Sequence, residues 1–101
     1  MTASLPVKVV RRATREIAEA AKWWTENRPS APEAFKEELR KAFALISSHP
    51  MVGARALNKN LPGVRRIHLS RISYHLYYRV TPHAIEVLAL WHTSRGAGPE
   101  L

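Results

Sequence analysis

The sequence lacks cysteine altogether, and this absence removes several kinds of chemistry at once. Disulfide bonds, thiolate metal sites and a cysteine nucleophile are excluded, and the composition is typical of a cytosolic protein. Long hydrophobic runs are also missing, because no apolar stretch approaches the roughly 18 residues that cross a bilayer. The opening segment, MTASLPVKVVRRA, has no long apolar core and no small-residue cleavage site. We therefore expect a cytoplasmic protein without a signal peptide and without a membrane partner.

Glycine is scarce, and its four positions do not form a phosphate-binding loop, because none of them opens a predicted helix. The histidines do not predict a metal site either, since they lack helical i, i+4 spacing and supporting cysteines. They stand at His49, His68, His75, His83 and His92. The sequence thus predicts neither a metal nor another cofactor.

Acidic residues are nearly absent from the second part of the chain. Residues 39–99 contain nine Lys or Arg and a single acid, Glu86, whereas residues 1–38 contain seven basic and six acidic residues. The formal net charge of the whole chain is +8. Such segregated charge favours an anionic partner, either a phosphate backbone or an acidic protein segment. A solvated surface that only keeps the protein soluble is the alternative.

A chain of 101 residues fits one domain, and neither an internal repeat nor a Gly/Ser-rich linker divides it. We predict a single domain over residues 1–101, in which residues 95–101 form a flexible tail.

The first elements are a strand and a helix. A β-branched run at residues 7–10 predicts the strand. Thr14 is the expected N-cap of a helix that runs to about Asn27, with apolar side chains at helical spacing. Trp24 belongs to this apolar stripe, whereas Trp23, about 100° away, lies at its edge or outside it. An exposed Trp23 is a candidate partner contact, and a half-buried ring over the sheet edge is the alternative.

A second helix follows after a short connection. Ser30 and Glu33 match a capping box, which predicts its start. Its apolar stripe continues until the SSHP sequence at residues 47–50. Residues 51–63 are basic and interrupted by glycine and proline, so we predict a loop there.

The remaining chain has the alternation of β-strands, beginning at residues 64–70. In residues 73–80 the alternation predicts two faces. One face carries Tyr74, Leu76, Tyr78 and Val80, and the other carries His75, Tyr77 and Arg79. Residues 85–91 are apolar on both faces, which is typical of a strand that is covered on each side. The order β-α-α-β-β-β predicts an α+β fold, with a helical hairpin packed on a small antiparallel sheet.

These elements carry residues that together resemble the RelE/ParE superfamily of bacterial toxins from type II toxin–antitoxin modules. The shared features are a proline-ended second helix, a basic strand, a Y-x-x-x-Y-R-V strand, and a last strand that closes on His with a nearby Arg. In this sequence they are Pro50, Arg65 with Arg66, Tyr74 to Val80, and His92 with Arg95. The resemblance spans almost the whole chain and implies the RelE/ParE-like fold.

The resemblance also implies partners. RelE-like members cut mRNA in the ribosomal A site, whereas ParE-like members lack that activity and inhibit DNA gyrase. Both kinds are neutralised by a small antitoxin with an acidic, partly disordered tail, and the modules are associated with plasmid stabilization. The expected partner is therefore a ParD-like antitoxin with an acidic C-terminal segment, in a toxin–antitoxin hetero-oligomer.

A nuclease would need a general base, a general acid and cations around the phosphate. Suitable residue types stand at His75, Arg79, His92 and Arg95, and His68 could join them if the strand register allows it. The resemblance implies that RelE-like nucleases tend to carry a lysine-rich stretch before or within the second strand, and that other nuclease members end in a His-Tyr pair. Here Lys59 is the only lysine after residue 42, and the ending WHTSRG contains no tyrosine. Both departures favour the ParE-like branch. Histidines and tyrosines on strands also more often pack than react.

We therefore predict a ParE-like toxin that inhibits DNA gyrase by binding, without a catalytic group of its own. The alternative is a RelE-like, ribosome-dependent mRNA endonuclease, with the ribosome and mRNA as partners, and a chain that only binds an antitoxin is a third. The residues expected to contact partners are Arg65, Arg66, Arg79, His92, Arg95 and Trp23. For Arg65 and Arg66, a solvated strand edge is an equally open interpretation.

Overall fold

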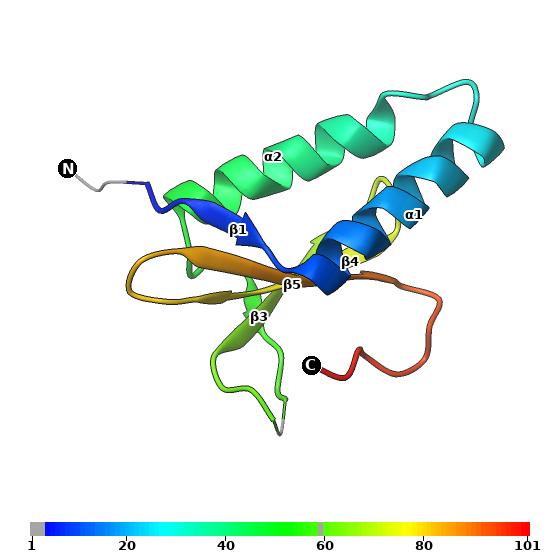
Figure 1. The fold of residues 1–101 in the computed structure, drawn as a ribbon. Coiled ribbons are helices and arrows are strands. Elements are labelled where there is room, and N and C mark those ends of the chain that lie inside the picture. Colours follow the sequence, from blue (N-terminus) through cyan, green and yellow to red (C-terminus); the bar gives the residue numbers. More distant parts are fainter. Residues whose placement is uncertain (1–3, 59) are drawn as a thin grey trace.

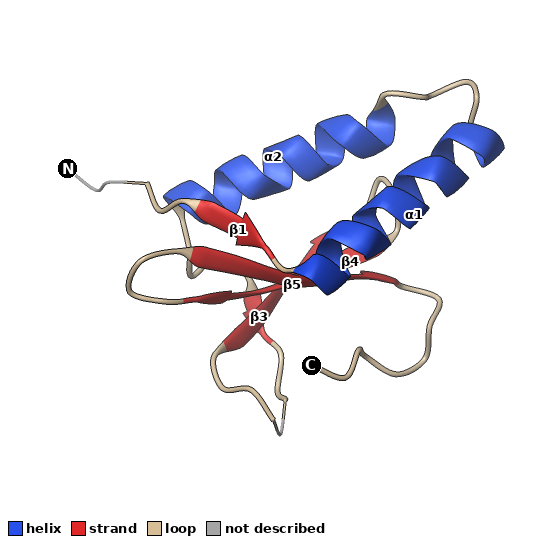
Figure 2. Cartoon of the chain, in the orientation of Figure 1, coloured by secondary structure: helices blue, strands red, loops and turns tan. Residues whose placement is uncertain are grey.

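The computed structural model describes residues 4–58 and 60–101, so Lys59 lies outside the described residues. Two helices, α1 (Arg11–Asn27) and α2 (Ala34–Ser48), cover the same face of one sheet (Figures 1 and 2). The strands of this sheet are β1 (Val7–Val9), β2 (Ala54–Arg55), β3 (Val64–Leu69), β4 (Tyr74–Val80) and β5 (Ile85–His92). No helix of the described part is long and apolar enough to span a membrane.

The sheet confirms the α+β prediction and adds two features to it. Its strand order is β1-β5-β4-β3-β2, and all neighbours from β5 to β2 are antiparallel. The first strand, in contrast, pairs in parallel with β5, so the sheet is mixed. The second addition is β2, a two-residue strand inside the segment that we predicted as a loop.

Both predicted helix caps are wrong. Helix α1 begins at Arg11, with Val10 in extended conformation as its N-cap, and Thr14 lies inside the first turn, where its hydroxyl donates to the Val10 carbonyl. Helix α2 begins at Ala34 without a side-chain cap. The preceding turn is held instead by the indole of Trp24, which donates to the carbonyl of Ala31 over 2.7 Å.

The main core lies between the helices and the sheet. The predicted division of β4 into two faces is confirmed, and the structure shows that the face at 74, 76, 78 and 80 is the one that packs into this core. The interpretation of the tryptophan pair is also confirmed, since Trp24 is 8% exposed and Trp23 is 44% exposed.

A smaller apolar cluster lies on the outer face of the sheet, away from the helices. It contains Val64, Tyr77, Leu88 and Ala89. An irregularity of register in the β4–β5 pair leaves Leu88 without a direct partner and places it in this cluster together with Ala89. Strand β5 is therefore covered on both faces, as its composition predicted.

Residues 95–101, for which we predicted a flexible tail, fold back toward this outer face (Figure 1). The indole of Trp91 donates to the carbonyl of Ala97 over 2.7 Å, and Arg12 donates to the carbonyl of Glu100. Pro99 is buried, and Leu101 packs against the outer cluster. The segment thus covers apolar surface of the sheet.

The turn after α2 is attached to the sheet by two side chains. The hydroxyl of Tyr78 donates to the carbonyl of Pro50 over 2.7 Å and accepts the N–H of Gly53 over 2.8 Å. The guanidinium of Arg65 donates to the carbonyls of Met51 and Gly53, over 3.2 and 2.8 Å. These contacts hold residues 50–53 in one conformation and bring β2 beside β3.

Candidate partner-binding site

The six residues predicted to contact partners do not all lie together, and the guanidinium groups of Arg65 and Arg79 are engaged by strong internal partners. Arg65 is held by the carbonyls of the 50–53 turn. Arg79 lies opposite Glu86 on β5, and its Nε donates to the Glu86 carboxylate over 2.6 Å. Both guanidinium groups therefore stabilise the fold, and some of their hydrogen-bond donors are already in use inside the protein.

A third predicted residue, Arg66, lies on the outer face near the two histidines of β3 and β4. His68 and His75 are directly opposite each other, with ring centroids 5.0 Å apart. One guanidinium nitrogen of Arg66 lies 3.4 Å from the hydroxyl of Tyr77. Burial lowers the pKa of His75, and the charges of Arg66 and His68 lower it further.

This pKa shift predicts a loss of stability in mild acid. Because the folded protein binds a proton at His75 less readily than the unfolded chain, the free energy of unfolding falls as the pH drops through and below about 6.5. Replacing His75 by Gln should reduce this fall. Urea unfolding of both proteins at pH 7.5 and pH 5.5 measures it, and an unchanged pH dependence in the variant would contradict the assignment.

The four residues of the nuclease alternative are divided between the two faces of the sheet. His75 and Arg79 point to the outer face, and Arg79 is ion-paired. His92 is paired with Tyr74, whose side chain packs into the helix-side core, and their rings stand edge to face at 5.0 Å. The geometry therefore does not bring the two histidines into one site.

Three of the predicted contact residues, Trp23, His92 and Arg95, line the same surface groove. They line a groove between α1 and the end of β5, with a volume of about 630 Å³. We call this surface the α1–β5 groove. Its full lining is Arg12, Arg15, Glu16, Glu19, Ala20, Trp23, Tyr74, Leu90, Trp91, His92 and Arg95.

Two of the lining arginines stack on the ring of Trp91, which packs against the outer apolar cluster. The guanidinium carbon of Arg95 lies 4.2 Å from the centre of the Trp91 ring, and that of Arg12 lies 5.9 Å from it. Such stacking fixes a flexible arginine while leaving its N–H donors available. Burial raises the pKa of the Tyr74 hydroxyl, which the charge of Arg95 partly offsets.

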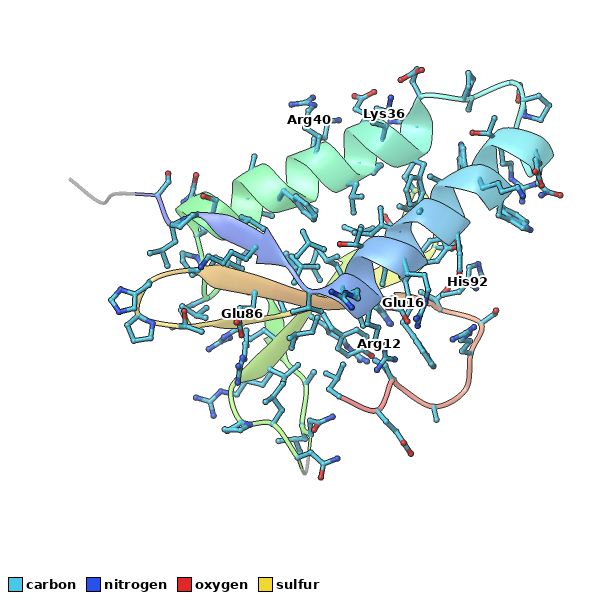
Figure 3. All side chains as sticks on the ribbon, viewed as in Figure 1. Arg12, Glu16, Lys36, Arg40, Glu86 and His92 are labelled. Carbon is cyan, nitrogen blue, oxygen red and sulfur yellow. The ribbon has the colours of Figure 1, made fainter. Side chains whose placement is uncertain are left out.

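Glu16 joins the two walls of the groove. One of its carboxylate oxygens accepts the backbone N–H of Leu90 over 3.1 Å, and the other accepts the Nε of Arg12 over 3.2 Å. Strand β1 pairs with β5 only up to Val87, so this carboxylate replaces a missing strand partner for Leu90. Figure 3 shows Arg12, Glu16 and His92 on the same side of the molecule, where α1 meets the end of β5.

The charges of the groove are partly balanced. Arg12 is paired with Glu16, and Arg15 lies 3.9 Å from the carboxylate of Glu19. Arg95 has no carboxylate partner within the described part of the chain. The groove therefore offers one unneutralised guanidinium beside an exposed indole, a combination that is enriched at protein interfaces.

Sequence reasoning did not assign the other eight lining residues to a site, among them Arg12, Glu16 and Trp91. The helical spacing of Arg12, Glu16, Glu19 and Trp23 places them along one side of α1, and this signal was available. The contact of that side with the end of β5 depends on the tertiary fold. Within the described residues, no group of three or more potential metal ligands gathers.

Comparison with known proteins identifies the family. The family model described as "ParE toxin of type II toxin-antitoxin system, parDE" matches residues 7–96. The chain therefore belongs to the ParE family of toxins from type II toxin–antitoxin systems, within the RelE/ParE superfamily. The predicted resemblance is confirmed. No curated protein matches the chain.

Solved structures of three proteins share its fold. A chain of the chromosomal ParDE toxin–antitoxin system from P. aeruginosa is 17% identical, with a TM-score of 0.72 over 90% of this chain and 98% of that one. A chain of the E. coli DinJ-YafQ toxin–antitoxin complex is 12% identical, with a TM-score of 0.66 over 94% and 99%. The YoeB dimer from Staphylococcus aureus gives 17% identity and a TM-score of 0.60 over 89% and 98%. At these identities the likeness establishes the fold alone.

Proposed function

We propose that this toxin inhibits DNA gyrase by binding to it, and that a ParD-like antitoxin with an acidic C-terminal segment neutralises it. The proposal is supported by where the candidate histidine, arginine and tryptophan side chains lie in the structure. Trp23, His92 and Arg95 gather in one groove suited to a protein contact. His75 and Arg79, which RNA cleavage would need beside His92, lie on the opposite face of the sheet.

The α1–β5 groove is the proposed gyrase contact. Arg95 is preorganised on the face of Trp91, so binding an acidic or polar group of gyrase costs little side-chain entropy. The exposed ring of Trp23 supplies an apolar anchor beside it. Arg65 and Arg79 support the fold in this proposal, and Arg66 remains available for partner contact on the outer face.

The antitoxin is proposed from charge and from the family. Residues 39–85 contain no Asp or Glu, so an acidic segment meets no repulsion over this part of the chain. The family is that of toxins from toxin–antitoxin systems, which suggests a toxin–antitoxin hetero-oligomer. The proposal places the protein in the cytoplasm, where gyrase acts.

A RelE-like mRNA endonuclease acting on the ribosome is the second candidate. One observation favours it, namely the pair of histidines at 68 and 75 beside Arg66 on the outer face. Two imidazoles next to a guanidinium are a chemically suitable set for acid–base cleavage of RNA. This set differs from the four residues predicted from the sequence.

Removing side chains from the groove tests the gyrase contact. We expect Arg95→Ala and Trp23→Ala each to raise the toxin concentration needed for half inhibition of supercoiling by about tenfold. The matched control is Arg40→Ala, because Arg40 is exposed on α2 and points away from the sheet (Figure 3). Equal inhibition by all three variants would exclude the groove as the contact.

A further inference from the structure

Strand β5 ends in a tight turn formed by residues 92–95, which we call the 92–95 turn. The N–H of Arg95 donates to the carbonyl of His92 over 3.1 Å, and this bond closes a four-residue β-turn. Inside the turn, the N–H of Thr93 donates to the carbonyl of Ser73 over 3.0 Å and attaches the turn to the connection between β3 and β4. His92 and Arg95 thus occupy the first and last positions of one anchored turn, which keeps them close together.

The imidazole of His92 is hydrogen-bonded within the same turn. Its Nδ1 lies 3.1 Å from the backbone nitrogen of Ser94 and 2.7 Å from the hydroxyl oxygen of that residue. A backbone N–H can only donate, so Nδ1 is the acceptor and carries no proton. The hydroxyl of Ser94 can donate to the same nitrogen, because its hydrogen rotates freely. In the neutral ring the proton is therefore on Nε2.

Tyr74 holds the plane of this ring. Tyr74 and His92 are paired across β4 and β5, and their rings stand edge to face with centroids 5.0 Å apart. Tyr74 is itself fixed in the main core, where its ring contacts Phe35. Within the described residues Nε2 of His92 makes no hydrogen bond. Its N–H is therefore left as a donor in the α1–β5 groove, which the ring lines where α1 meets the end of β5 (Figure 3).

Arg95 supplies further donors from the same turn. Its guanidinium carbon lies 4.2 Å from the centre of the Trp91 ring, and the group has no carboxylate partner within the described part of the chain. The Nε2–H of His92 and the guanidinium of Arg95 offer donors without an acceptor. Such a pair suits an oxyanion that accepts from both groups.

The remaining charges of the groove favour a carboxylate over a nucleic-acid phosphate. Glu16 and Glu19 belong to the lining, and each already has an arginine neighbour on α1. A DNA duplex carries one charge per roughly 1.7 Å of its axis, so it would place several phosphates beside these two acids. A protein segment brings a single carboxylate instead, with apolar neighbours that can cover the exposed ring of Trp23.

From these observations we infer that the 92–95 turn is a preformed receptor for one carboxylate, in which Ser94 positions the Nε2–H of His92. The inference rests on the proposed function for its partner, an Asp or Glu side chain of gyrase. It adds the chemical group that is recognised and the residue that orients the receptor. Because Nδ1 is satisfied inside the turn and Arg95 is stacked on Trp91, binding costs little side-chain freedom.

Two substitutions of His92 test which ring nitrogen meets the partner. A glutamine amide can place an N–H near the position of Nε2, whereas the shorter asparagine reaches only the position of Nδ1. We expect His92→Gln to raise the toxin concentration for half inhibition of supercoiling about twofold, and His92→Asn to raise it about tenfold. The matched controls are His83→Gln and His83→Asn in the exposed turn between β4 and β5, and both should leave inhibition unchanged.

Nitrogen NMR of the isotope-labelled full chain tests the receptor without gyrase, with sodium acetate as the probe. The ring nitrogens of His92 should show the Nε2–H tautomer, and acetate should shift Nε2 of His92 and Nε of Arg95 in a saturable way. Ser94→Ala should raise the acetate concentration for half saturation about threefold, because one of the two donors to Nδ1 is lost. Ser94→Thr keeps a hydroxyl and should restore it.

Several results would overturn the inference. An Nδ1–H tautomer of His92, or acetate that leaves both residues unshifted, would show that the turn is not a carboxylate receptor. Equal losses for His92→Gln and His92→Asn would show that Nε2 does not donate to the partner. If His92→Asn weakened binding to a short DNA duplex as much as it weakened gyrase inhibition, the turn would belong to a phosphate backbone. If the parent chain does not inhibit gyrase, the proposed target fails, whereas the acetate titration still decides whether the receptor exists.

Discussion

Replacing Gly53 by alanine is expected to destabilise the protein by about 3 kcal/mol. An added Cβ would lie 2.7 Å from the hydroxyl oxygen of Tyr78 and 2.9 Å from the backbone carbonyl oxygen of Arg66. Neither atom can move freely, because the Tyr78 side chain is fully buried and the Arg66 carbonyl belongs to β3. The turn would have to shift and lose its hydrogen bonds to Tyr78.

Thermal unfolding measures this effect, and for a domain of this size the expected fall in Tm is roughly 15 °C. The matched control is Gly96→Ala, where the new Cβ meets no atom within 4 Å. Its Tm should stay within about 2 °C of the parent. Equal Tm values for the two variants would show that the turn is not held as we describe.

The second large effect concerns Glu16. Glu16→Ala leaves the N–H of Leu90 without an acceptor at a buried residue that is 4% exposed. It also removes the ion pair of Arg12, which keeps its hydrogen bond to the Glu100 carbonyl and its place over the ring of Trp91. We expect a loss of about 2 kcal/mol in the free energy of unfolding, and a weaker contact between α1 and the end of β5.

Urea unfolding gives this free energy, and Glu19→Ala is the control on the same side of the same helix. The Glu19 carboxylate is 71% exposed and 3.9 Å from Arg15, so its removal should cost less than about 0.5 kcal/mol. A loss for Glu16→Ala as small as that for Glu19→Ala would mean that Leu90 does not depend on this carboxylate.

Much of the fold could be predicted because burial follows periodicity. The alternation in β4 separates Tyr74, Leu76 and Tyr78 from His75 and Tyr77, and the structure places the two sets on opposite faces. The apolar composition of β5 on both faces likewise indicated two covering layers. These patterns are local, so a single sequence carries them.

The helix starts could not be predicted in the same way. Thr14 and Ser30 have the right chemistry for caps, but tertiary contacts decide where each helix begins. Val10 directly follows β1, and its N–H donates to the carbonyl of Val87 on β5. The chain is therefore still extended at Val10, and α1 begins at Arg11. The parallel pairing of β1 with β5 is also non-local, because it joins residues 78 positions apart in the sequence, such as Val7 and Ile85.

The candidate groove contains three residues that the sequence had singled out. Trp23 was identified from its angle to the apolar stripe of α1, and His92 and Arg95 from the resemblance of the last strand to that of the toxin superfamily. Arg65 and Arg79 look equally cationic in the sequence, yet their internal partners become visible only in the fold. The role of Glu16 depends on an unpaired backbone N–H of β5, for which side-chain chemistry gives no signal.

A direct comparison of the two candidate targets tests the central claim. The purified chain is titrated into supercoiling by DNA gyrase and, in parallel, into ribosome-dependent cleavage of mRNA. Our account predicts that supercoiling is inhibited, that Arg95→Ala weakens this inhibition, and that mRNA stays intact. Cleaved mRNA together with unimpaired supercoiling at every concentration would contradict it, and would shift attention to the histidine pair on the outer face.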